Sequence, residues 1–173
     1  KSCGVKRMDN EKKVSAAPKM PISDTRAVFF GDDHYLRIVE QPRGKPEYVA
    51  TRKDTLTNFQ LASRYGSLGL LAHNFEAGKY FQELKIGDAL RLMDGSGNSI
   101  PYCVKYIKRY QALSPRSPRS KFVDLETMEK LGAADVFKRV YMGDGTKVVL
   151  QTCIAEGKEE EWGRLFVICE PQK

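Results

Sequence analysis

Residues 147–169 read KVVLQTCIAEGKEEEWGRLFVIC, and this stretch carries the clearest structural pattern in the chain. Its apolar, β-branched beginning predicts a strand that ends at Gln151-Thr152-Cys153. A polar segment rich in glycine, lysine and glutamate follows, and a second predicted strand then begins at Gly163-Arg164 and continues as LFVIC. Two strands joined in this way are expected to form an antiparallel hairpin, which places Cys153 opposite Arg164 at the edge of a sheet.

Upstream of this pair, short β-type runs recur from about Thr25 onward and are separated by turn sequences rich in Gly, Asp and Asn. The predicted strands cover 27–30, 35–39, 48–51, 68–71, 89–93 and 100–110. Helices are predicted over 55–64 and over 124–137, the second of which begins at Asp124. Seven or eight short strands with two or three helical insertions indicate a closed β-barrel or a β-sandwich.

The composition indicates one globular domain, since the 173 residues are 41% hydrophobic and 29% charged. Residues 1–21 are polar, basic and without periodicity, so they are predicted to form a flexible stalk or linker ahead of a folded domain at 22–173. This segment has no apolar core of the kind a signal peptide needs. The sequence also contains no run of 18 apolar residues, which a membrane-spanning helix requires.

The net charge of +7 is concentrated in two places. Residues 1–20 carry six basic and two acidic side chains, and residues 105–121 carry six basic side chains and no acidic one. A β-barrel that binds nucleic acid through 105–121 is therefore one alternative, although the rest of the chain is neutral or acidic. Tyrosines at every fourth position of that region share one face of a strand, where they serve either base stacking or core packing: Tyr102, Tyr106 and Tyr110.

Cysteine spacing argues against a metal centre. The chain has four cysteines: Cys3, Cys103, Cys153 and Cys169. They form no C-x-x-C pair and no zinc-type spacing with His34 or His73, and no acidic cluster has the spacing of a calcium loop. We therefore assign no metal and no organic cofactor. Cys103 and Cys169 lie inside apolar strands and are interpreted as packing residues.

His73 completes a candidate site with Cys153 and Arg164. It follows the apolar run 68–71 directly, at a junction between strand and loop where catalytic residues are common. A cysteine nucleophile needs a base or ion-pair partner, and a nearby cation stabilises the negative charge that develops in acyl transfer. On spacing alone, a buried core thiol, a structural histidine and a solvated arginine remain alternatives.

Three stretches together resemble one family: LLAHNFEAGKYFQELKIGDALRL around His73, VVLQTC ending at Cys153, and GRLFVI opening with Arg164. In order and spacing they resemble the sortases, the bacterial cysteine transpeptidases that attach proteins to cell walls or polymerise pilins. The resemblance covers residues 66–170. Val149 stands where the family's Thr-Leu-x-Thr-Cys motif has its first threonine, and residues 25–65 match poorly.

The resemblance implies a mainly β fold, a closed eight-stranded β-barrel with short helical insertions, and a two-step reaction. Cys153 would attack the Thr–Gly bond of a Leu-Pro-x-Thr-Gly-like sorting signal, with His73 as the proton-transfer partner. Arg164 would hold the substrate backbone or the oxyanion, and Thr152 would contribute to substrate binding. An amine from a cell-wall precursor or a pilin lysine would then resolve the thioester.

The implied partners are surface proteins or pilins that bear a sorting signal, together with the amine acceptor, and not nucleic acid. Sortases are held outside the membrane by an N-terminal hydrophobic segment, so we expect an anchor ahead of Lys1 and an extracytoplasmic location. A catalytically inactive sortase-fold domain that binds proteins is the other alternative. The basic segment SPRSPRSK (114–121) and the helix after it are expected to set substrate preference.

Overall fold

The computed structural model describes residues 22–31 and 33–173, so the predicted stalk at 1–21 lies outside the described residues. The described chain forms ten strands, which are β1 (Thr25–Phe30), β2 (His34–Glu40), β3 (Thr55–Phe59), β4 (Ser67–Leu71), β5 (Ala89–Asp94), β6 (Ser99–Ala112), β7 (Phe122–Asp124), β8 (Lys130–Leu131), β9 (Lys147–Glu156) and β10 (Glu159–Pro171). Its helices are a 3-10 turn η1 (Ile22–Asp24), α1 (Gln60–Ser63), α2 (Gly78–Glu83) and α3 (Ala133–Tyr141).

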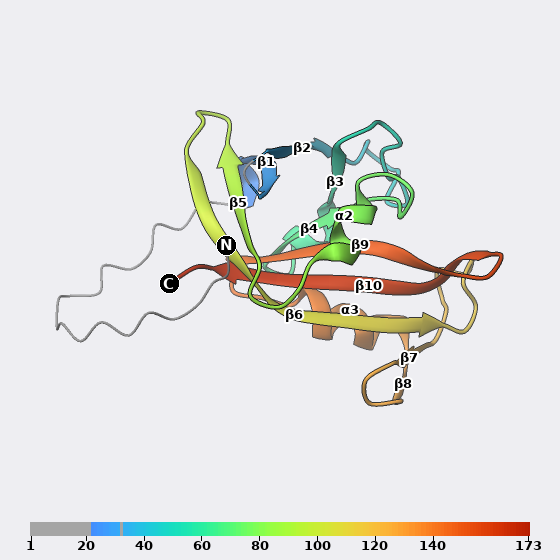
Figure 1. Ribbon diagram of the computed structural model, residues 1–173. Helices are drawn as coiled ribbons and strands as arrows, with labels where there is room; N and C mark the ends of the chain where they lie inside the picture. The colour runs from blue at the N-terminus through green and yellow to red at the C-terminus, as the bar shows by residue number, and fades with distance from the viewer. Residues whose placement is uncertain (1–21, 32) are drawn as a thin grey trace, which may run out of the picture.

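Eight of the strands close into a barrel in the order β10-β9-β4-β3-β2-β1-β5-β6, and β6 pairs with β10 to complete the ring (Figure 1). Neighbouring strands are antiparallel except for the pairs β2–β3 and β4–β9, which are parallel. β7 and β8 extend the sheet beyond β6. The prediction of a closed eight-stranded barrel is therefore confirmed.

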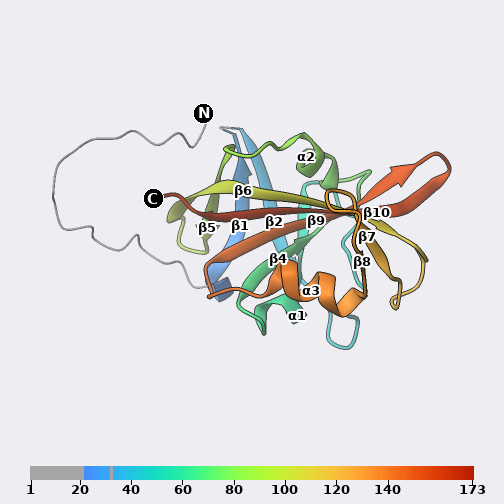
Figure 2. The same cartoon turned by 90° about the horizontal axis from the view of Figure 1, so that it is seen from below.

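The strands of the barrel separate two hydrophobic cores. Side chains that point inward from β9, such as Val148 and Leu150, pack in the barrel interior, while Val149 between them packs in a second core outside. This division follows from the alternation of side chains along a strand. Helix α2 contributes Phe81 to the interior core, and α3 contributes Val140 to the outer one. Figures 1 and 2 show these two helices on different sides of β9 and β10.

Two predicted elements are wrong in the segment that leads into β4. Residues 55–64 were expected to be helical, but Thr55–Phe59 forms strand β3 and only Gln60–Ser63 forms a helical turn. Pairing with β2 on one side and β4 on the other determines this structure, because tertiary burial overrides local helix propensity. The predicted strand at 48–51 is a loop, in which the Ala50 N–H donates a hydrogen bond to Thr57 Oγ1 at 2.8 Å.

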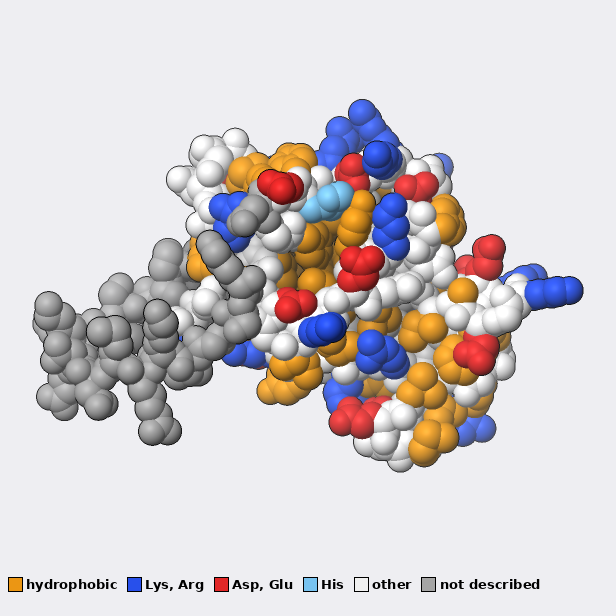
Figure 3. All heavy atoms as spheres, viewed as in Figure 1, with side chains coloured by type: hydrophobic (Ala, Val, Ile, Leu, Met, Phe, Trp, Pro, Cys, Tyr) orange, Lys and Arg blue, Asp and Glu red, His pale blue; other side chains and the backbone are white. Residues whose placement is uncertain are grey.

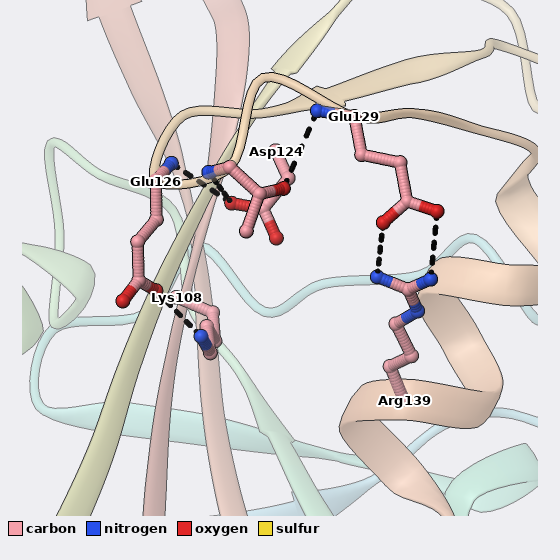
Figure 4. Close-up of polar contacts among 6 residues, drawn as sticks. Lys108, Asp124, Glu126, Glu129 and Arg139 are labelled. Atoms are coloured by element: carbon pink, nitrogen blue, oxygen red, sulfur yellow. Dashed lines mark hydrogen bonds and ion pairs between the residues drawn. The ribbon is translucent and has the colours of Figure 1, made fainter.

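The predicted helix at 124–137 begins later, at Ala133. Asp124 ends strand β7, and its carboxylate accepts the backbone N–H groups of Glu126 and Thr127, so it caps a turn instead of a helix. Met128 has a φ of 62°, which interrupts helical geometry at that point. Figure 4 shows the resulting loop tied to its surroundings by ion pairs, which are Lys108–Glu126 at 2.6 Å and Arg139–Glu129 at 2.9 Å.

In the part of the chain that the structure describes, no helix has the length and apolar character needed to cross a bilayer. Charged side chains of both signs are interspersed over the face drawn in Figure 3.

Candidate active site

Strands β4, β9 and β10 bring the three predicted catalytic residues to one level of the sheet. In the parallel pair β4–β9, Leu71 lies opposite Gln151, and the Ala72 N–H continues the pairing by donating to the Gln151 carbonyl at 3.1 Å. His73 and Cys153 each follow this pair by two residues, so they occupy equivalent positions on neighbouring stretches of chain. The expected strand ends at Cys153 and Gly163 were wrong, because β9 continues to Glu156 and β10 begins at Glu159. On the other side of β9, the antiparallel register places Arg164 directly opposite Cys153, as the hairpin prediction required.

The same three side chains share the outer face of the barrel. Along β9 the inward residues are Val148, Leu150 and Thr152, which leaves Cys153 on the outer face. On β10, Leu165 belongs to the interior core, and its neighbour Arg164 therefore points outward. Ala72 is also part of the interior core, which gives His73 the outward position after β4. The row His73–Cys153–Arg164 consequently lies outside the barrel, on the side that α3 partly covers.

Cys153 is a half-buried free thiol in an environment of mixed charge. Burial raises the pKa of the Cys153 thiol, the Arg164 guanidinium lowers it, and the Glu161 carboxylate raises it, for a net upward shift. Cys169, the other free thiol among the described residues, is buried inside the barrel. Cys103 is buried as expected, but it is also disulfide-bonded, so the interpretation of it as a packing residue alone is incomplete. Cys153 is therefore the partly exposed free thiol among the described residues.

The Arg164 guanidinium donates hydrogen bonds to carbonyl oxygens of two segments, its own hairpin and the segment after β6. Its Nη1 donates to the carbonyls of Glu161 at 2.8 Å and Gly163 at 3.0 Å, within its own hairpin. Its Nη2 donates to the Pro115 carbonyl at 3.0 Å, which lies in the basic segment after β6. This contact connects the 114–121 segment, which was expected to set substrate preference, to a candidate catalytic side chain.

The loop that carries His73 is braced against its surroundings. The His73 ring stacks on Phe75, with centroids 5.0 Å apart and an interplanar angle of 13°. The His73 carbonyl accepts the N–H groups of Glu76 and Gly78, which turns the chain into α2. Asn74 Nδ2 donates to the Glu160 carbonyl at 3.2 Å, so the same loop contacts the β9–β10 hairpin. These contacts fix the His73 loop to helix α2 and to the β9–β10 hairpin.

Thr152, the fourth predicted site residue, lies on the inner face of β9 and is 2% exposed. Its Oγ1 has no hydrogen-bond partner among the described residues. Helix α2 approaches it so closely that a Cβ on Gly78 would lie 2.2 Å from Thr152 Oγ1 and 2.6 Å from the His73 carbonyl oxygen. This placement makes Thr152 a support beneath the His73 loop and puts its hydroxyl on the opposite face from Cys153.

Two residues near the site were not identified from the sequence. The Tyr141 hydroxyl, at the end of α3, donates a hydrogen bond to Gln151 Oε1 on the outer face of β9. Alternation along the strand was sufficient to place Gln151 on the face of Cys153, but no sequence pattern connects it to Tyr141.

The described residues contain no group of three or more His, Cys, Asp or Glu side chains arranged to hold a metal ion.

No protein-family model and no curated protein matches the chain. Solved structures do match, among them sortase C from Clostridium perfringens SM101, at 18% identity and a TM-score of 0.54 over 87% of this chain and 70% of that one. The same enzyme with its C-terminal cell wall sorting motif gives 18% identity and a TM-score of 0.55, over 87% and 71%. Sortase A from Corynebacterium diphtheriae gives 14% and 0.55, over 91% of this chain and 63% of that one. The chain therefore has the sortase fold.

Proposed function

We propose that this chain is a sortase-type cysteine transpeptidase, with Cys153 as nucleophile, His73 as proton-transfer partner and Arg164 as the group that binds substrate oxygens. The observation that carries the proposal is the row of these three side chains on one outer face of a sortase-fold barrel. His73 follows the end of β4, whereas Cys153 and Arg164 lie within β9 and β10. The cysteine among them is the partly exposed free thiol of the described chain.

In the first step, Cys153 Sγ attacks the threonine carbonyl carbon of a Leu-Pro-x-Thr-Gly-like sorting signal. A C–S bond forms, the Thr–Gly C–N bond breaks, and His73 delivers a proton to the departing glycine amine. The raised pKa of Cys153 means that its resting form at neutral pH is the neutral thiol. The proton that His73 later delivers is therefore supplied by the thiol itself when it attacks.

Arg164 is suited to bind the substrate because its guanidinium already holds three backbone carbonyl oxygens. A substrate carbonyl, or the oxyanion that develops from it, would replace one of them. The Pro115 carbonyl is the natural partner to be displaced, because it belongs to a separate segment and not to the Arg164 hairpin.

In the second step an amine attacks the thioester, an amide bond forms, and Cys153 is released as a thiol. The proposed acceptors are a cell-wall precursor or a pilin lysine, and the proposed donors are surface proteins or pilins. The solved sortase C with a cell wall sorting motif supports this substrate class. An extracytoplasmic location with an N-terminal membrane anchor belongs to the same proposal.

The test is a cleavage and ligation assay on a pool of Leu-Pro-x-Thr-Gly-like peptides, with an amine acceptor, analysed by chromatography and mass spectrometry. We expect cleavage between Thr and Gly and transfer of the N-terminal fragment to the amine. Cys153→Ala removes both activities, whereas Cys169→Ala, the matched control at the buried thiol, retains them. Peptide binding by the wild-type chain without cleavage would favour the inactive binding domain instead.

A further inference from the structure

Phe75 is a large apolar side chain that lies outside both hydrophobic cores of the protein. It follows the proposed proton-transfer residue His73 by two positions and is 63% exposed. Aromatic side chains stabilise a fold mainly through the area that they bury. Core packing therefore does not account for Phe75, and its contact with His73 is the feature to consider.

The Phe75 ring lies nearly flat against the His73 imidazole. The two ring centroids are 5.0 Å apart and the ring planes differ by 13°, so the rings are stacked. The loop that carries both residues is held by hydrogen bonds. The His73 carbonyl accepts two backbone N–H groups of the turn into α2, and Asn74, between the two rings in sequence, donates to the Glu160 carbonyl. The stack is therefore built on a braced backbone.

This stack is the interaction that orients the imidazole. In the part of the chain that the structure describes, neither ring nitrogen of His73 is hydrogen-bonded or ion-paired. The orientation of a functional histidine is often set by a hydrogen bond from one ring nitrogen to a carboxylate or a backbone carbonyl. At His73 the face of an aromatic ring takes that role instead. Both nitrogens stay available, one as a donor and one as an acceptor in the neutral imidazole.

An aromatic face also suits the charged form of the histidine. In the proposed first step the Cys153 thiol gives its proton to His73, which is an imidazolium until it protonates the departing amine. A cation within about 6 Å of an aromatic centroid is attracted by the electron-rich face of the ring. The Phe75 ring would therefore hold the imidazole and the imidazolium in one place, whereas an aliphatic side chain lacks this attraction.

We propose that Phe75 is a positioning residue for His73, because its ring fixes the orientation of the imidazole from which the proton passes to the departing amine. This inference rests on the proposed function. Phe75 itself exchanges no proton and acts through His73. Its loss should therefore lower the rate of acylation at saturating peptide and leave the KM for the peptide unchanged.

The test compares Phe75→Leu, which keeps an apolar side chain but removes the ring, with Phe75→Tyr, which retains the ring. The matched control is Tyr48→Leu, which changes an exposed aromatic residue in the loop before β3. We expect Phe75→Leu to acylate about 10- to 100-fold more slowly at saturating peptide, the cost of a slightly misplaced catalytic group. Phe75→Tyr and the control should behave like wild type, and the urea midpoint should be the same in all four proteins. Wild-type acylation by Phe75→Leu, or a loss that appears only in KM, overturns the proposal.

Proton NMR separates this inference from the proposed function. The chain has two histidines, so two sets of imidazole signals are expected, and His34→Gln assigns them. The ring current of Phe75 should displace the His73 signals, and Phe75→Leu should return them toward the positions of an unstacked histidine while the His34 signals stay in place. This result supports the positioning of His73 even if wild type forms no acyl-enzyme and the transpeptidase proposal fails. Identical His73 signals in wild type and Phe75→Leu overturn the role of Phe75, whatever the acylation rate.

Discussion

The inner and outer faces of strand β9 differ in burial and in chemical role over residues 148–153. On the inner face Val148, Leu150 and Thr152 are all at most 2% exposed and belong to or adjoin the barrel interior. On the outer face exposure grows along the strand, from Val149 buried under α3 to the half-buried Gln151 and Cys153. The inner face thus packs in the barrel interior throughout. The outer face packs under α3 at Val149 and carries the candidate reactive thiol at Cys153, where α3 no longer covers the strand.

The largest expected effect is loss of activity without loss of fold, on the outer face. Cys153→Ala should lower acyl-enzyme formation by at least about 1,000-fold, because it removes the nucleophile. The free energy of unfolding should change by only about 0.5 kcal/mol, since the side chain is small and half-exposed. Peptide turnover and urea unfolding of the same preparation check both parts. A variant that still cleaves would contradict the assignment of Cys153.

A substitution on the inner face of β9 should lower stability instead of removing the nucleophile. Leu150→Ala removes a side chain that is 0% exposed in the barrel interior, and we expect the free energy of unfolding to fall by about 2–5 kcal/mol. Urea unfolding followed by far-ultraviolet circular dichroism measures the change, with Cys153→Ala as the reference from the other face. A loss below 0.5 kcal/mol would show that the inner face is not the one that holds the barrel together.

The contact between α2 and β9 links the two faces through the His73 loop. Gly78→Ala places a Cβ where Thr152 Oγ1 and the His73 carbonyl now lie, so we expect a loss of about 1–3 kcal/mol in stability together with slower acylation. Adding Thr152→Ala in the double variant removes the first of these clashes. Part of the stability should return, as a double-mutant cycle would detect. Strict additivity of the two substitutions would argue against this contact.

The smallest expected effect concerns the pH dependence of Cys153. Its pKa is raised above the ordinary value, so alkylation by iodoacetamide should keep accelerating with pH above that value, as the thiolate forms. Because Glu161 raises this pKa and Arg164 lowers it, Glu161→Gln should speed alkylation at pH 8 by about 2- to 5-fold and Arg164→Ala should slow it. Glu160→Gln, the neighbouring carboxylate, is the matched control and should leave the rate unchanged. Equal rates in Glu161→Gln and Glu160→Gln would contradict the assigned cause.

The same contrast explains how much the sequence alone could predict. Two apolar strands and the glycine-containing turn between them are local features of residues 147–169. The β9–β10 hairpin and the pairing of Cys153 with Arg164 could therefore be predicted from this stretch alone. The position of His73 followed from the strand before it. Alternation along β9 also places Thr152 on the inward face, which a match to the Thr-Cys motif does not show by itself.

What the sequence could not predict depends on contacts between distant segments. Residues 55–59 form a strand because β2 and β4 pair with them on either side, and a short window contains neither partner. Tyr141 reaches Gln151 only because α3 ends there and Gly69 leaves room for its ring, whereas the helix predicted from the sequence ended at 137. The contact between Pro115 and Arg164 likewise joins residues far apart in the chain.

The central claim, that Cys153 forms a thioester with a sorting signal on the outer face of β9, is tested most directly by trapping that species. Wild type is mixed with the peptide pool without an acceptor amine, quenched in acid, and analysed by intact mass and by peptide mapping. The account predicts a mass gain equal to the N-terminal peptide fragment, located on Cys153 and reversed by hydroxylamine. No adduct with any peptide, or an adduct on another residue, would contradict it.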